Sequence, residues 1–83
     1  MGADMDTSRL KRPVYPVPLD VSTALDEANL WPRYRARPPY QRNDYIGWIT
    51  RAQRPETRAA RLEQMLDELE SGDGYMGMPY RAS

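Results

Sequence analysis

The sequence predicts a small all-α protein, in which two strong C-terminal helices form an array with a short N-terminal helix. Apolar residues recur at helical spacing through the C-terminal half, and no alternating strand pattern competes with them. The 83 residues are enough for one small domain with a thin core. We therefore expect an extended or disordered, proline-rich N-terminal strap over 1–17, a single helical domain over 18–72 and a flexible C-terminal tail over 73–83.

The proline-rich strap leads into the first helix. Pro13, Pro16 and Pro18 exclude a helix in this segment and favour extended backbone, because each proline lacks an N–H and restrains the residue before it. Asp20 is the expected N-cap of a short helix over about 21–29, since apolar residues follow it at helical spacing.

Prolines also limit residues 32–39, where one helical turn is the most that we expect. Trp31 and Tyr34 are available there to anchor the chain. From Tyr40 onward a helical face returns, formed by Tyr45, Trp48, Ile49 and Ala52. Gly47 lies inside this helix at a cost of about 1 kcal/mol relative to alanine, which suggests that another backbone or a ring comes close to it.

The longest predicted helix runs over about 55–71. Pro55 suits its first position, and Gly72 is a reasonable stop after its last. The tail that follows contains turn formers among aromatic and methionine residues, and it either folds back over the core as a flap or extends freely. The two long helices are expected to meet through a shared core of Tyr45, Trp48, Ile49, Leu62, Met65, Leu66 and Leu69.

The composition argues against an enzyme. The chain contains no cysteine and no histidine, which removes the usual zinc ligands, the usual general base at neutral pH and every cysteine nucleophile. We therefore expect no catalytic residue, no metal and no cofactor. No apolar run approaches the roughly 20 residues that cross a bilayer, and the N-terminus lacks the apolar core of a secretion signal. A cytoplasmic protein that does not use a membrane is the expectation.

Charge is unevenly distributed, although basic and acidic residues number twelve each. The middle of the chain carries most of the arginines, between two acidic ends. Arg54, Arg58 and Arg61 form a stripe at the start of the last long helix, where the partial positive charge of a helix N-terminus disfavours cations. None of the three has an acidic partner at helical spacing, so a group outside the helix should compensate.

Three arrangements would compensate this stripe, and the sequence leaves them open. Arg58 or Arg61 can rest on a ring and reach an acidic residue elsewhere, the candidates being Trp48, Tyr45, Asp20, Asp26 and Asp44. Free N–H groups at the helix start, beside Arg54 and Arg58, can bind a phosphate or carboxylate. Two copies packed antiparallel can form a homodimer. The candidate binding residues, for an anionic ligand or a protein partner, are Arg54, Glu56, Thr57, Arg58 and Arg61.

An alternative function is that of a small RNA- or DNA-binding accessory protein. The stretch "RYRARPPYQR" interleaves arginines with tyrosines, a composition that holds phosphates and stacks bases. The zero net charge and the pI near 6.2 argue against nucleic acid, because binding domains of this kind are usually basic. The contacts in this alternative would be made by Arg33, Arg35, Arg37 and Arg42.

A family resemblance rests on two stretches, "VPLDVSTALDEA" and "YQRNDYIGWITRAQRPETRAARLEQMLDELESG". They resemble the YdeI/OmpD-associated family, also described as bacteriocin-protection proteins. The resemblance covers residues 18–72 and rests on Pro18, Asp20, Ala24, Leu25, Tyr45, Trp48, Ile49, Ala52, Glu56, Thr57, Arg58, Arg61 and Gly72. Gln53 replaces the family's usual lysine, so any role of that lysine does not carry over. The resemblance implies a helical fold and protection of bacteria from toxins or stress, without an established molecular activity.

Overall fold

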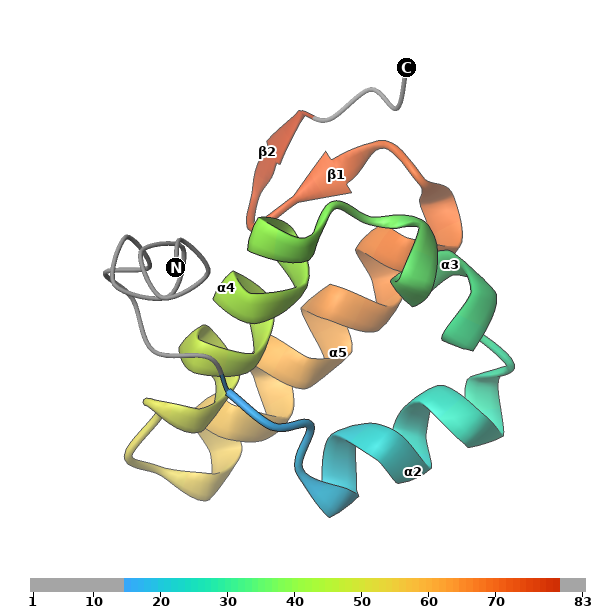
Figure 1. Ribbon diagram of the computed structural model, residues 1–83. Helices are drawn as coiled ribbons and strands as arrows, with labels where there is room; N and C mark the ends of the chain where they lie inside the picture. Colours follow the sequence, from blue (N-terminus) through green and yellow to red (C-terminus); the bar gives the residue numbers. More distant parts are fainter. Residues whose placement is uncertain (1–14, 80–83) are drawn as a thin grey trace, which may run out of the picture.

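The computed structural model describes residues 15–79 and confirms the predicted all-α class. The predictions made for residues 1–14 and 80–83 lie outside this described part. Helix α5 contacts α2, α3, α4 and β1, so it is the central element of the fold (Figure 1). In chain order the elements are α2 (Leu19–Ala28), α3 (Trp31–Ala36), α4 (Pro39–Thr50), α5 (Pro55–Ser71), β1 (Gly74–Tyr75) and β2 (Met78–Pro79).

Helix α2 begins at Leu19, and its N-cap is Pro18 rather than the predicted Asp20. The carbonyl of Pro18 accepts a helical hydrogen bond from the N–H of Ser22 at 2.9 Å. Asp20 lies in the first turn instead, where its carboxylate accepts the N–H of Val21 at 2.9 Å. The helix dipole also favours an acidic group at this position. Asp20 therefore stabilises the start of α2 as a residue of its first turn and not as its N-cap.

Helix α3 spans six residues, so the prediction of one turn at most over residues 32–39 is wrong. Pro32 lies within the first two positions of the helix, where the missing N–H of a proline costs nothing. Arg37 follows the last turn in an extended conformation (φ −74°, ψ 149°), as expected for a residue that precedes a proline. Tyr34 is buried and anchors this helix, as the sequence suggested.

Helices α4 and α5 agree closely with the predicted ones. The first residue of α4 is Pro39, one position before the predicted start. Helix α5 has the predicted bounds, with Pro55 in its first position. Gly72 caps it in the left-handed region (φ 82°), a conformation that glycine adopts without steric cost.

The core lies between α5 and the three helices that contact it. Its fully buried apolar side chains are Val21, Leu25, Tyr45, Ile46, Ile49, Met65 and Leu69. Trp48, Leu62 and Leu66, which the sequence placed in the core, are only partly buried and pack against it. The helical face of α4 is therefore rotated toward Ile46, a position that the predicted stripe did not include.

The chain after α5 folds back as a flap, which is one of the two predicted alternatives. It forms a short antiparallel hairpin that the sequence did not predict, with Gly74 opposite Pro79 and Tyr75 opposite Met78. The two turn residues, Met76 (φ 52°) and Gly77 (φ 87°), both adopt positive φ, as tight hairpin turns require. Strands of two residues are too short to show an alternating pattern, which explains the missed prediction.

The described part of the strap, residues 15–18, is docked on α4. The N–H of Tyr15 donates to Oδ1 of Asn43 at 2.8 Å. The ring of Tyr15 lies against Gly47, where a Cβ would come within 2.7 Å of Cε2 of the ring and 3.0 Å of Nη1 of Arg51. The close approach of a ring to this glycine is therefore confirmed.

We expect Gly47→Ala to have different effects with and without the Tyr15 ring. In a Tyr15→Ala background the change should raise the free energy of unfolding by about 1 kcal/mol, because alanine is the better helix former. With Tyr15 present, the new Cβ displaces the ring and the gain should shrink or reverse. Urea unfolding of the four variants measures the difference; an equal gain in both backgrounds would show that the ring does not press on this position.

Candidate functional site

The arginine stripe of α5 is compensated mainly inside the molecule. Arg58 forms a two-pronged contact with Asp20 of α2, with Nε to Oδ2 at 2.9 Å and Nη2 to Oδ1 at 3.1 Å. The hydrogen bond from Arg58 is the main reason that the pKa of Asp20 lies below its usual value. The pairing alternative is thus confirmed for this arginine, and the pair joins the start of α5 to the start of α2.

Arg61 joins α5 to the end of α4. Its Nη1 donates to the carbonyl oxygen of Trp48 at 2.6 Å, and its guanidinium carbon lies 5.3 Å from the centroid of the Trp48 ring. A cation is favoured both at the carbonyl end of a helix and over an indole ring. Two arginines in the N-terminal half of α5 therefore connect this helix to its neighbours: Arg58 binds α2, and Arg61 binds α4.

Arg54 differs from the other two arginines because it is largely exposed. Its nearest carboxylate oxygen belongs to Glu56, at 3.9 Å, and the two side chains are 78% and 72% exposed. A contact of this length in water contributes little. An anion or partner site formed by Arg54, Glu56 and Thr57 with Arg58 and Arg61, and a homodimer through α5, stay predictions.

The opposite end of α5 is served by the arginines of residues 33–37. Arg33 Nη1 donates to the carbonyl oxygens of Leu69 (3.2 Å) and Glu70 (2.6 Å). Arg37, only 5% exposed, donates through Nη2 to the carbonyl oxygens of Glu68 (3.0 Å) and Gly74 (2.8 Å). The last carbonyls of a helix carry partial negative charge and most lack helical donors, although that of Glu68 also accepts the N–H of Gly72 at 2.8 Å. These cations therefore complete the end of α5.

This use of Arg33 and Arg37 bears on the nucleic-acid alternative. Two of its four proposed contacts are made to the protein's own backbone, and Arg35 lies 5.2 Å from the ring centroid of Trp31. Sequence reasoning missed the capping role because it joins segments more than thirty residues apart. Nucleic-acid binding through this segment stays a prediction that no contact described here supports.

Glu68 is the polar centre that holds the hairpin on the helices. Its carboxylate accepts hydrogen bonds from the hydroxyl of Tyr45 and from Nε2 of Gln64 at 3.1 Å. It also accepts the backbone N–H groups of Met76 at 2.6 Å and Gly77 at 2.8 Å. One carboxylate thus links α4, α5 and the hairpin turn.

These hydrogen bonds determine the ionisation of both partners at this centre. Burial acts to raise the pKa of Glu68, but the hydrogen bonds from Tyr45, Gly77, Gln64 and Met76 outweigh it, so the pKa lies below its usual value. Burial and the adjacent carboxylate raise the pKa of Tyr45. Glu68 is therefore a permanent anion and Tyr45 a permanent donor at neutral pH, which suits a structural role.

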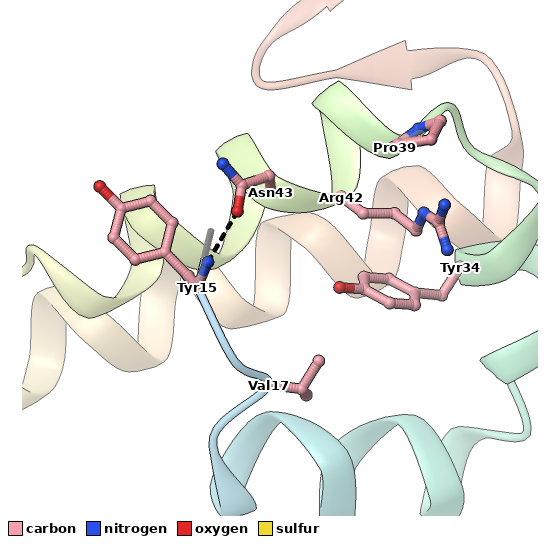
Figure 2. Close-up of a pocket in the computed structure, with 6 residues that line it drawn as sticks. All are labelled: Tyr15, Val17, Tyr34, Pro39, Arg42 and Asn43. Atoms are coloured by element: carbon pink, nitrogen blue, oxygen red, sulfur yellow. Dashed lines mark hydrogen bonds between the residues drawn. The ribbon is translucent and has the colours of Figure 1, made fainter. Parts of the chain in front are cut away.

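A pocket of about 280 Å³ lies where the strap, α3 and α4 meet (Figure 2). We call it the strap pocket. Its volume is slightly below the range of about 300–1,000 Å³ typical of small-molecule sites. It is lined by Tyr15, Val17, Tyr34, Pro39, Arg42 and Asn43.

Arg42 is the charged residue of the strap pocket. Figure 2 shows its side chain reaching from α4 toward the Tyr34 side of the pocket. Its Nε is closed off from solvent and has no hydrogen-bond partner among the described residues. Burial raises the pKa of Tyr34, with the charge of Arg42 acting in the opposite sense. A buried donor without an acceptor is uncommon in native proteins and therefore calls for an explanation.

Sequence reasoning found only part of this pocket. It selected Arg42, but for a different ligand, and it did not select Tyr15, Val17 or Asn43. The wall residues come from three segments that no short-range pattern connects, and the strap contributes one side of the pocket by docking on α4. The signal in the sequence that could have indicated the pocket is the proline-rich strap, whose apolar residues precede the amphipathic helices and can pack on them.

The described residues contain no cluster of acidic or other ligating side chains that could hold a metal ion. In the same part of the chain, every helix is too short or too polar to cross a bilayer. The arrangement is suited to non-covalent binding: an apolar, partly aromatic recess with one guanidinium at its wall.

These features define a small all-helical protein with an arginine-bearing pocket. The chain belongs to the bacteriocin-protection, YdeI or OmpD-associated family, whose family model matches residues 14–72. The resemblance seen in the sequence is confirmed, and the match includes the whole of α2 to α5 together with Tyr15 and Val17 of the strap. No curated protein and no solved structure matches the chain.

We expect Glu68→Gln to lower the free energy of unfolding by about 2 kcal/mol at pH 7, because a neutral amide cannot accept all of the hydrogen bonds made to the carboxylate. The lowered pKa means that the carboxylate stabilises the fold fully above about pH 5 and that this contribution is lost as the pH falls through the folded-state pKa. Urea unfolding from pH 7 to pH 3 should therefore show a weaker pH dependence in the variant.

The matched control for this experiment is Glu63→Gln on the exposed face of the same helix. It should leave both the stability and its pH dependence nearly unchanged. If the two variants behaved alike, the role of Glu68 as the polar centre of the hairpin would be wrong.

The pair of Arg58 and Asp20 should show measurable coupling. A double-mutant cycle with Arg58→Met and Asp20→Asn is expected to give a coupling of about 0.5–1 kcal/mol at low salt, typical of a partly exposed pair of good geometry. The coupling should decrease at about 1 M salt, where charges are screened. The cycle on Arg54 and Glu56 is the control, and it should give a coupling near zero at every salt concentration.

Proposed function

We propose that the protein is a non-enzymatic binding protein that takes a small organic anion into the strap pocket. The single observation that carries this proposal is the guanidinium of Arg42, whose Nε is closed off from solvent and has no acceptor among residues 15–79. Leaving a buried donor unpaired costs about 1–3 kcal/mol. A small rotation of the guanidinium would let a ligand in the pocket supply the missing acceptor.

The walls of the strap pocket support this proposal because they are largely held in place before a ligand arrives. Tyr34 is only 5% exposed and packs edge-on to Trp31, with 5.6 Å between ring centroids. The strap is fixed by the hydrogen bond from Tyr15 to Asn43 and by the contact of the Tyr15 ring with Gly47. A site whose side chains are already positioned loses less entropy when a ligand binds.

The family name supplies a setting for this activity. In a family described by bacteriocin protection, we propose that the protein protects the cell in the cytoplasm by binding, under stress or toxin exposure. The absence of histidine and cysteine from the sequence favours binding over turnover, because the usual groups for acid–base and nucleophilic catalysis are missing.

Arg42→Met should separate stability from binding. The substitution removes the unpaired Nε and keeps the stem, so the free energy of unfolding should stay the same or rise by up to about 2 kcal/mol. Binding of a panel of small organic anions, followed by the amide resonances of residues 15, 17, 34, 42 and 43, should be lost. Unfolding in urea and NMR titration measure the two effects.

Arg54→Met is the matched control, because it removes the same charge from an exposed site outside the pocket. It should leave both the binding and the affected resonances unchanged. If no anion of the panel shifts the pocket resonances of the native protein, the proposed function is wrong.

A further inference from the structure

We infer that the strap pocket selects a free monocarboxylate with a compact aromatic or branched apolar body, in preference to a phosphate ester. This inference rests on the proposed function and adds the chemical class of its ligand. It follows from four features of the pocket: its charge, the donors available at the start of α4, the geometry of its guanidinium and the nature of its walls.

The charge of the lining matches one negative charge. Arg42 is the cation of the lining, and none of the other lining residues is ionised at neutral pH. Sites that hold phosphate groups usually bring together several cations or a helix N-terminus, because the group carries close to two charges. A single guanidinium balances a monocarboxylate and leaves a phosphate ester partly uncompensated.

The start of α4 adds almost no donors for a phosphate. Pro38 and Pro39 occupy the N-cap and the first position of the helix, and neither has an N–H. The N–H groups of Gln41 and Arg42 both donate to the carbonyl oxygen of Pro38, at 3.0 and 3.1 Å. Apart from the N–H of Tyr40, which does not belong to the lining, the backbone at this end of the pocket lacks an N–H or has it already paired, unlike the amide cradles that bind phosphate.

The protein contains an internal example of the contact that we infer. Arg58 binds the carboxylate of Asp20 side-on, through Nε at 2.9 Å and Nη2 at 3.1 Å. In Arg42 the corresponding Nε has no partner among the described residues. A ligand carboxylate that accepted this Nε–H and an adjacent Nη–H would reproduce the same planar fork.

The walls and the volume limit the rest of the ligand. Val17 and Pro39 offer apolar surface, and the ring of Tyr34 offers aromatic surface on which a second ring can pack. The ring of Tyr15 is directed away from Tyr34 and Arg42 (Figure 2) and lies against Gly47. A volume of about 280 Å³ leaves space for a body of about one ring beside the carboxylate. A small acid of this size fills the pocket, whereas most of an extended chain or a peptide would lie outside it in solvent.

The test compares the binding of four probes to the 83-residue chain at constant ionic strength, by NMR titration or calorimetry: benzoate, benzamide, phenyl phosphate and acetate. Benzoate should bind at least about tenfold more tightly than each of the others, which corresponds to about 1.4 kcal/mol. Benzamide tests the charge, phenyl phosphate tests the anion class and acetate tests the apolar body. The shifted amides should be those of residues 15, 17, 34, 42 and 43.

Variants locate the effect at Arg42. Arg42→Lys keeps the charge but loses the planar fork, so it should weaken benzoate binding by about tenfold; Arg42→Met should abolish the binding. Arg54→Met is the matched control and should change the affinity less than about twofold. Far-ultraviolet circular dichroism and urea unfolding verify that each variant is folded.

Each contrary result has a distinct meaning. If phenyl phosphate binds as tightly as benzoate in an Arg42-dependent manner, or if acetate does, the ligand class is wrong while the proposed function stands. If benzamide equals benzoate, or if no probe shifts the pocket amides, both are wrong. If benzoate shifts the amides near Arg54 instead, an anion is bound at the start of α5 and the strap pocket is not the site.

Discussion

The charge distribution of helix α5 is the constraint on which the rest of the structure depends. Its arginines lie at the end that carries partial positive charge, and acidic residues dominate the end that carries partial negative charge. Such a helix is poorly stabilised by its own side chains. The other elements supply the opposite charges: Asp20 of α2 binds Arg58, the carbonyl end of α4 receives Arg61, and Arg33 and Arg37 cover the last carbonyls of α5. The inverted helix is thereby the common partner of the other three helices and of β1.

The carboxylate of Glu68 completes this arrangement for the hairpin. Two residues per strand cannot form an independently stable sheet, so the hairpin depends on what binds its turn. The N–H groups of Met76 and Gly77 both end on this carboxylate, and the rings of Tyr75 and Tyr45 pack edge-on at 5.4 Å. These polar contacts add stability to a thin apolar core. A small chain without cysteine depends on such contacts because it cannot form disulfides.

Local patterns in the sequence predicted α4, α5 and the glycine that ends α5, because these features depend on side chains three or four positions apart and on proline or glycine at the boundaries. The same patterns predicted α2 with its N-cap misplaced, and they underestimated the length of α3, where Pro32 lies in the first turn of the helix instead of interrupting it. Arg33, Arg37 and Arg42 could be selected as unusual, but their roles could not be assigned from the sequence. Those roles depend on carbonyl groups and pocket walls that only the folded chain brings near them.

The strap is the wall of the pocket that does not belong to the helical array. It is held to α4 by a backbone hydrogen bond to Asn43 and by a ring that lies against a glycine, and Tyr15 and Val17 pack against the core from outside. A molecule bound between strap and helices would strengthen this attachment, and by thermodynamic reciprocity any partner that pulled the strap away would release that molecule. The same few contacts would then make residues 15–18 a coupling element, through which occupancy of the strap pocket affects how firmly the strap is held on α4.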